Sequence, residues 1–84
     1  MCTYQTETLE LSGSGKGAGG WFSLSNASVY FDHPVHYLAE HSLNIDFLNL
    51  DGAAPSRVAV ELDPASAREL ARAILTALDT AGEA

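Results

Sequence analysis

The sequence predicts a small α+β protein, in which a mostly antiparallel sheet of about four strands precedes one C-terminal amphipathic helix. Four stretches combine apolar or β-branched residues with alternation of period two, which is typical of strands. Turn-forming residues separate these stretches, and one stretch with helical spacing fills the last quarter of the chain. The 84 residues are expected to form a single domain, 1–84, near the lower size limit for a hydrophobic core.

The first two strands are expected on either side of a glycine-rich segment. Residues 3–11 are rich in Thr, Tyr and Leu and predict the first strand. Residues 12–20 contain five glycines and predict a loop. This loop does not match a phosphate-binding motif, because Gly17 stands where Ser or Thr is required. Residues 21–31 predict the second strand, with apolar side chains of both parities, so both faces of this strand are expected to be covered.

The remaining strands and the helix follow a short histidine-containing turn. Residues 42–50 and 57–62 alternate apolar and polar side chains and predict the third and fourth strands. The helix is expected to start at Pro64 after an Asp63 N-cap and to end near Gly82. Its apolar face is formed by side chains that recur at helical spacing, namely Ala67, Leu70, Ala71, Ile74, Leu75 and Leu78.

This apolar helix face is expected to pack on one side of the sheet. One helix can cover only one side of a four-stranded sheet, so the other side is left open. That open side is expected to carry Asn44, Asp46 and Glu61, since these residues share the outward parity of their strands. It would be a solvated face, a pocket or a subunit interface.

Composition narrows the classes of partner. Eleven acidic and four basic residues give a net charge of −7, which argues against nucleic acid and anionic membranes, because phosphate binding needs clustered Lys and Arg. The first residues lack the basic and apolar regions of a signal peptide, and no stretch approaches the roughly 18 apolar residues of a membrane span. We therefore expect a cytoplasmic protein. The small core also predicts a homo-oligomer.

All three histidines of the chain fall within nine residues, as His33, His36 and His41. Neutral imidazole is the commonest protein metal ligand, and the nearby carboxylates of Glu40 and Asp46 can orient ligands or act as bases. The cluster predicts a transition-metal site for Zn, Ni, Cu or Fe. The spacing matches no standard zinc signature, and the alternative interpretation is an ordinary turn with solvated or partly buried histidines.

Two further residues are candidates for the same site. Removal of Met1 would expose Cys2, whose α-amine and thiol together form a chelating group and a nucleophile. Cys2 is therefore a candidate fourth ligand, although a frayed terminus is the plain alternative. Tyr37 lies inside the histidine segment and can donate a hydrogen bond to a bound ligand.

Three functional hypotheses follow. The leading one is a metal-dependent enzyme that acts on a small metabolite through the clustered histidines. The second is a metal-free biosynthetic cyclase, isomerase or hydratase, in which a histidine and Asp46 transfer the proton. The third is a non-enzymatic oligomeric binding module that uses its open sheet face. Composition does not separate these three hypotheses.

The sequence also resembles a family of small proteins from high-GC bacteria that is known as a domain of unknown function. The resemblance covers nearly the whole chain and implies one complete domain, but it implies no activity. It rests on the following segments: Met1-Cys2-Thr3-Tyr4, Gly15-Lys16-Gly17-Ala18 with Gly20-Trp21, Val29-Tyr30-Phe31-Asp32-His33-Pro34-Val35-His36, Glu40-His41-Ser42-Leu43-Asn44-Ile45-Asp46-Phe47, and Arg57-Val58-Ala59-Val60-Glu61-Leu62.

Overall fold

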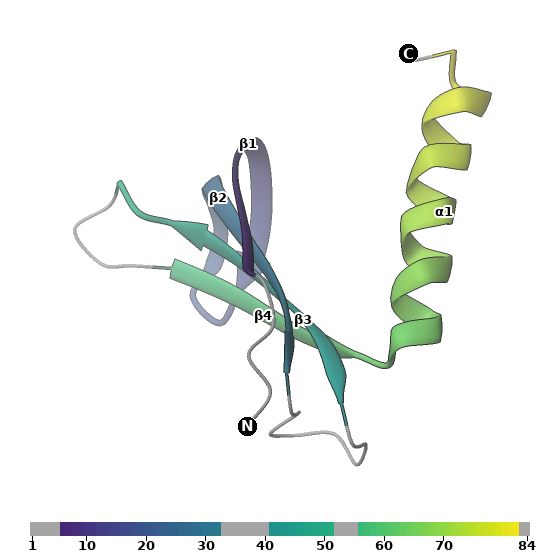
Figure 1. Cartoon of the computed structure of the whole chain (residues 1–84). Coiled ribbons are helices and arrows are strands. Elements are labelled where there is room, and N and C mark those ends of the chain that lie inside the picture. Colours follow the sequence, from purple (N-terminus) through teal and green to yellow (C-terminus); the bar gives the residue numbers. More distant parts are fainter. Residues whose placement is uncertain (1–5, 33–40, 52–55, 83–84) are drawn as a thin grey trace.

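Four antiparallel strands, paired in the order in which they occur along the chain, form the sheet of this protein (Figure 1). The computed structural model describes residues 6–32, 41–51 and 56–82. The α+β class and the antiparallel sheet with one C-terminal helix are confirmed. The elements are β1 (Thr6–Gly17), β2 (Gly20–Asp32), β3 (Ser42–Asn49), β4 (Ser56–Leu62) and α1 (Pro64–Thr80).

The glycine-rich segment is mostly strand, so the prediction of a loop over 12–20 was wrong. β1 continues to Gly17, and only Ala18 and Gly19 form the turn to β2. Ladder pairing with β2 accounts for the difference, because interstrand hydrogen bonds override the weak strand propensity of glycine. Glycine also leaves room here, since a β-carbon at Gly17 would lie 3.3 Å from Cε1 of Phe22 and 3.6 Å from the backbone oxygen of Arg57.

The β1–β2 hairpin curls over one end of the sheet, which brings β1 near β4. Leu24 of this hairpin lines a single pocket together with Phe47 of β3 and Val58 of β4. The ladder between β1 and β2 shifts register between Glu10 and Gly13, and such irregularities bend a sheet. The hairpin therefore covers one end of the apolar side of the sheet.

The sheet has one apolar and one polar face, as the alternation predicted. Ladder partners lie on the same face, so the register assigns each side chain. Of the described apolar residues, only Ala27 is fully buried, at 2% exposure. The apolar face is formed by Ala27, Val29, Phe31, Leu43, Ile45, Phe47, Val58, Val60 and Leu62. The polar face is formed by Tyr30, Ser42, Asn44, Asp46, Arg57 and Glu61.

The helix begins and ends where the sequence predicts. The carboxylate of Asp63 accepts a 2.6 Å hydrogen bond from the backbone N–H of Ser66, which makes Asp63 the N-cap, and Pro64 is the first helical residue. The chain leaves the helix through Gly82, whose φ of +82° suits glycine. In the described part of the chain, no helix is long and apolar enough to cross a membrane.

The expectation that this helix packs on the sheet was wrong. Figure 1 shows α1 leaving the end of β4 and standing away from the sheet, and no residue of α1 is buried. Its N-terminal part lies nearest the sheet, where helix residues from Ala67 to Ile74 line an open groove with Leu43 and Leu62. Amphipathic spacing gives the helix an apolar stripe, but the direction in which the helix leaves the sheet depends on the short connection between Leu62 and Pro64. The stripe therefore remains exposed.

Candidate functional site on the polar face

Three side chains from three strands meet at the centre of the polar face. The Oδ1 atom of Asp46 in β3 accepts hydrogen bonds from Nε and Nη2 of Arg57 in β4, at 3.1 Å and 2.9 Å. The Oδ2 atom of the same carboxylate accepts a longer hydrogen bond, at 3.4 Å, from the hydroxyl of Tyr30 in β2. Both oxygens of Asp46 are therefore engaged by groups of the chain itself.

The register explains why these three residues meet. Asp46 lies opposite Ser28 on β2 and opposite Ala59 on β4, so Tyr30 and Arg57 are its diagonal neighbours on the same face. Diagonal neighbours in a sheet are within reach of long and aromatic side chains. The Asp46 side chain is 15% exposed whereas the Arg57 side chain is 58% exposed, so the ion pair has one sheltered and one open partner.

The electrostatics of this cluster keep Tyr30 neutral and Arg57 charged. Burial, and then the neighbouring charge of Asp46 and the hydrogen bond to it, raise the pKa of Tyr30 above its ordinary value. The hydrogen bond and the charge of Asp46 also raise the pKa of Arg57. A phenol, a carboxylate and a guanidinium held in a row can hydrogen-bond a polar ligand or partner. The Tyr30 hydroxyl already donates to Asp46, so its oxygen is left to accept, and the remaining N–H groups of Arg57 are the donors.

A second polar pair lies next to this row and is more deeply buried. Ser42 is 0% exposed and Asn44 is 5% exposed, although both residues belong to the polar face. The Ser42 hydroxyl donates a 2.7 Å hydrogen bond to Oδ1 of Asn44 and lies 3.4 Å from the backbone oxygen of Asp32. Buried polar groups of this kind require satisfied hydrogen bonds, so the pair fixes the start of β3 against the end of β2.

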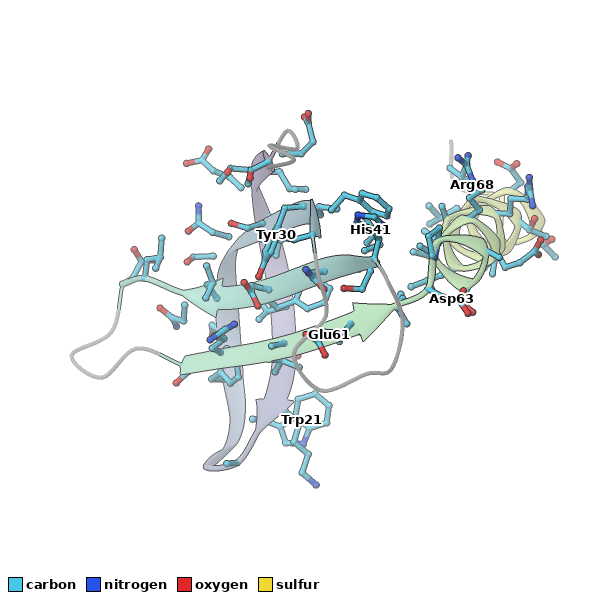
Figure 2. The ribbon with its side chains drawn as sticks, turned by 60° about the horizontal axis from the view of Figure 1, so that its bottom comes forward. Trp21, Tyr30, His41, Glu61, Asp63 and Arg68 are labelled. Atoms are coloured by element: carbon cyan, nitrogen blue, oxygen red, sulfur yellow. The ribbon has the colours of Figure 1, made fainter. Side chains whose placement is uncertain are left out.

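His41 lies at the end of the sheet that carries the Ser42–Asn44 pair. It is on the apolar face, opposite to the face that carries Asp46. Its imidazole stacks on the ring of Phe31, with 5.4 Å between the ring centroids and 15° between the planes. Phe31 belongs to the apolar face, whereas Asp46 belongs to the polar face. Figure 2 labels His41, which stacks on Phe31, and Tyr30, which contacts Asp46. The structure therefore does not bring His41 and Asp46 together, and the partners of Asp46 are Arg57 and Tyr30.

The other predicted site residues lie outside the described residues. These are Cys2, His33, His36, Tyr37 and Glu40. Among residues 6–32, 41–51 and 56–82, no group of three His, Cys, Asp or Glu side chains is arranged to hold a metal ion. The predicted histidine site and the roles of its members thus stay predictions.

Sequence reasoning missed Tyr30, Arg57 and Ser42 as members of a polar cluster. The signal for Arg57 was available, because Asp46 and Arg57 have outward parity on consecutive strands and opposite charge. The signal for Tyr30 was weaker, because an aromatic residue inside an apolar strand usually indicates core. Nothing in the sequence shows that Ser42 is buried.

The burial of Tyr30 and its contact with Asp46 make stability sensitive to alkaline pH. The folded-state pKa of Tyr30 lies above the ordinary value of 10.0, so folding favours the neutral phenol. That contribution is fully present below about pH 10 and is lost as the pH rises through the folded-state pKa. We expect Tyr30→Phe to flatten the alkaline fall of the urea midpoint, measured by circular dichroism. An unchanged fall in this variant would show that other groups cause it.

The whole chain, residues 1–84, matches the model of a family of unknown function, DUF6295. The chain therefore belongs to this family. Neither a curated protein nor a solved structure matches the chain.

Proposed function

Since membership of this family carries no activity, we propose that the chain is a small metal-binding protein that acts on a small metabolite, in the cytoplasm. His33, His36 and His41 would bind a transition metal ion, such as Zn, Ni, Cu or Fe, and Cys2 would be a fourth ligand. Tyr37 and Glu40 would then contact or activate the substrate. The donor set is chemically suited to these metals, which prefer imidazole and thiolate ligands.

The observation that supports this proposal is the pairing of the residues on either side of the histidine segment. Asp32 and Ser42 are partners in the β2–β3 ladder. The nine residues between them, 33–41, therefore connect two positions that lie at the same end of the sheet. A connection this short restricts its members to one region, so histidines that are close in sequence are available to a single site.

A second feature supports a metal site at this end of the sheet. The Ser42–Asn44 pair ties the start of β3 to the end of β2, and the ring stack with Phe31 holds His41. Metal ligands bind best when neighbouring groups hold them in place. Asp46 stays a candidate base, and its carboxylate is held by Arg57 and Tyr30 on the polar face.

The test is the metal content of untagged protein, measured by elemental mass spectrometry together with intact mass. The proposal predicts close to one transition-metal ion per chain. It also predicts loss of this metal in His36→Ala and in His41→Phe. The second variant is the sharper one, because phenylalanine keeps the ring stack on Phe31 and removes both ring nitrogens.

The matched control replaces a polar residue outside the histidine segment by alanine. Asn49→Ala lies at the other end of β3 and is expected to keep the wild-type metal content. Metal-free protein that takes up none of the four ions would contradict the proposal. Unchanged stoichiometry in both histidine variants, with the fold retained by circular dichroism, would contradict it as well.

A further inference from the structure

We propose that a second copy of this chain covers the apolar groove between α1 and the sheet, and that its own α1 is the element that enters the groove. The groove has a volume of about 330 Å³. On the sheet side it is lined by Val29, Leu43, Ile45 and Leu62, which come from the apolar face. This inference concerns assembly and does not depend on metal binding.

The first argument is the surface that the single chain leaves exposed. The chain exposes 6333 Å², whereas a compact protein of 8.9 kDa is expected to expose about 4,800 Å². The excess of about 1,500 Å² is larger than the roughly 800 Å² that each partner buries in an interface of standard size. The Cα radius of gyration of 14.2 Å also exceeds the roughly 12 Å expected for a chain of this length. The single chain is therefore more open than a compact protein of its size, by more than one partner's share of a standard interface.

The second argument is that much of the exposed surface is apolar and lies on α1. Ile74 and Leu75 of α1 are 52% and 62% exposed, and Leu70 and Leu78 on the same stripe are also exposed. Figure 2 looks nearly along α1 and shows the helix separated from the sheet. A helix with one apolar stripe gains most of its stability from burying that stripe, so the isolated chain leaves this contribution unused.

The third argument is reciprocity. Within one chain, the apolar stripe of α1 and the apolar face of the sheet border the same groove. Neither surface buries the other. A second copy brings both missing counterparts at once, because its α1 can enter this groove while this α1 enters the equivalent groove of the partner. Such mutual exchange gives a closed two-fold dimer, which is the commonest form of homo-oligomer.

Charge favours the helix as the meeting surface. The whole chain carries −7, so two copies repel each other over most of their surface. Within α1 the charges cancel, because Arg68 and Arg72 balance Glu69 and Asp79. The residues 73–78 carry no charge at all. The helix is thus the part of the chain on which two acidic copies meet with the least repulsion.

The first experiment uses the untagged wild-type chain. Sedimentation equilibrium should give a mass of twice the monomer, and the thermal midpoint should rise with protein concentration, because association stabilises the folded chain. A monomer mass at all concentrations, with a midpoint independent of concentration, overturns the proposal. This measurement does not depend on whether any variant folds.

The second experiment locates the surface with a matched pair of variants. Ile74→Glu places a charge on the apolar stripe and should reduce the mass to that of the monomer. Thr76→Glu places the same charge two residues further along, on the opposite side of the helix, and should leave the dimer intact. If both variants remain dimeric, the interface does not involve this stripe and the proposal is overturned.

A third measurement separates exchange of helices from simple helix–helix contact. In a mixture of isotope-labelled and unlabelled chains, filtered nuclear Overhauser effects should connect methyl groups of Ile74 or Leu78 with those of Val29 or Ile45 between different chains. Contacts between chains that involve only α1 with α1 would overturn the assignment of the groove as the docking site.

Discussion

Replacement of Ala27 by Asp is expected to unfold the protein, or to lower its free energy of unfolding by at least about 3 kcal/mol. Ala27 is 2% exposed and lies between Leu9 and Phe47 in the ladder. A carboxylate at this position would lose its hydration, and the apolar neighbours offer it no partner. A domain of this size has only a few kcal/mol of stability, so the loss is large relative to the total.

Urea denaturation followed by circular dichroism measures this effect. The control is Ser23→Asp, which puts the same residue at an exposed position of the same strand. It matches the poor strand propensity of aspartate and should cost less than about 1 kcal/mol. If Ala27→Asp unfolds at the urea concentration of the wild type, Ala27 does not lie in the packed centre of the sheet.

The second large effect is expected at the buried Ser42–Asn44 pair. Asn44→Ala removes the acceptor that lies 2.7 Å from the Ser42 hydroxyl and should cost about 1–2 kcal/mol. The cost is limited because the same hydroxyl can turn to the backbone oxygen of Asp32, at 3.4 Å. Ser42→Ala should cost a similar amount, since it leaves the buried amide of Asn44 without this donor.

A double-mutant cycle tests whether the two residues act together. The double variant Ser42→Ala with Asn44→Ala should be less destabilised than the sum of the two single variants, by about 1 kcal/mol. Urea midpoints of the four proteins provide the energies. Asn49→Ala combined with Ser42→Ala serves as the control. Asn49 accepts a hydrogen bond from the backbone N–H of Asp51 at an exposed position, so the energies of these two substitutions should simply add. A simple sum in both cycles would mean that the buried pair contributes no coupling.

The sequence was most informative where local chemistry decides the structure. Asp63, Pro64 and Gly82 mark the ends of α1 because capping depends on groups within one helical turn. The alternation in β3 and β4 was also sufficient, because side-chain direction in a strand repeats every two residues. These features gave the class, the element order and the division into an apolar and a polar face.

Features that depend on distant partners could not be predicted in the same way. The strand conformation of residues 12–17 depends on pairing with β2, so glycine content alone pointed to a loop. The position of α1 depends on how the chain leaves Leu62, and an apolar stripe does not say what covers it. The contacts of Asp46 depend on its diagonal register with Tyr30 and Arg57, which the alternation within each strand does not fix.

The order of the strands affects how the protein is made. Each strand after β1 pairs with the strand that precedes it in the chain, so every ladder can form from segments that the ribosome has already released. The sheet can therefore grow one hairpin at a time during synthesis. Because α1 follows β4 in the chain, the helix that we assign to the partner leaves the ribosome after all four strands.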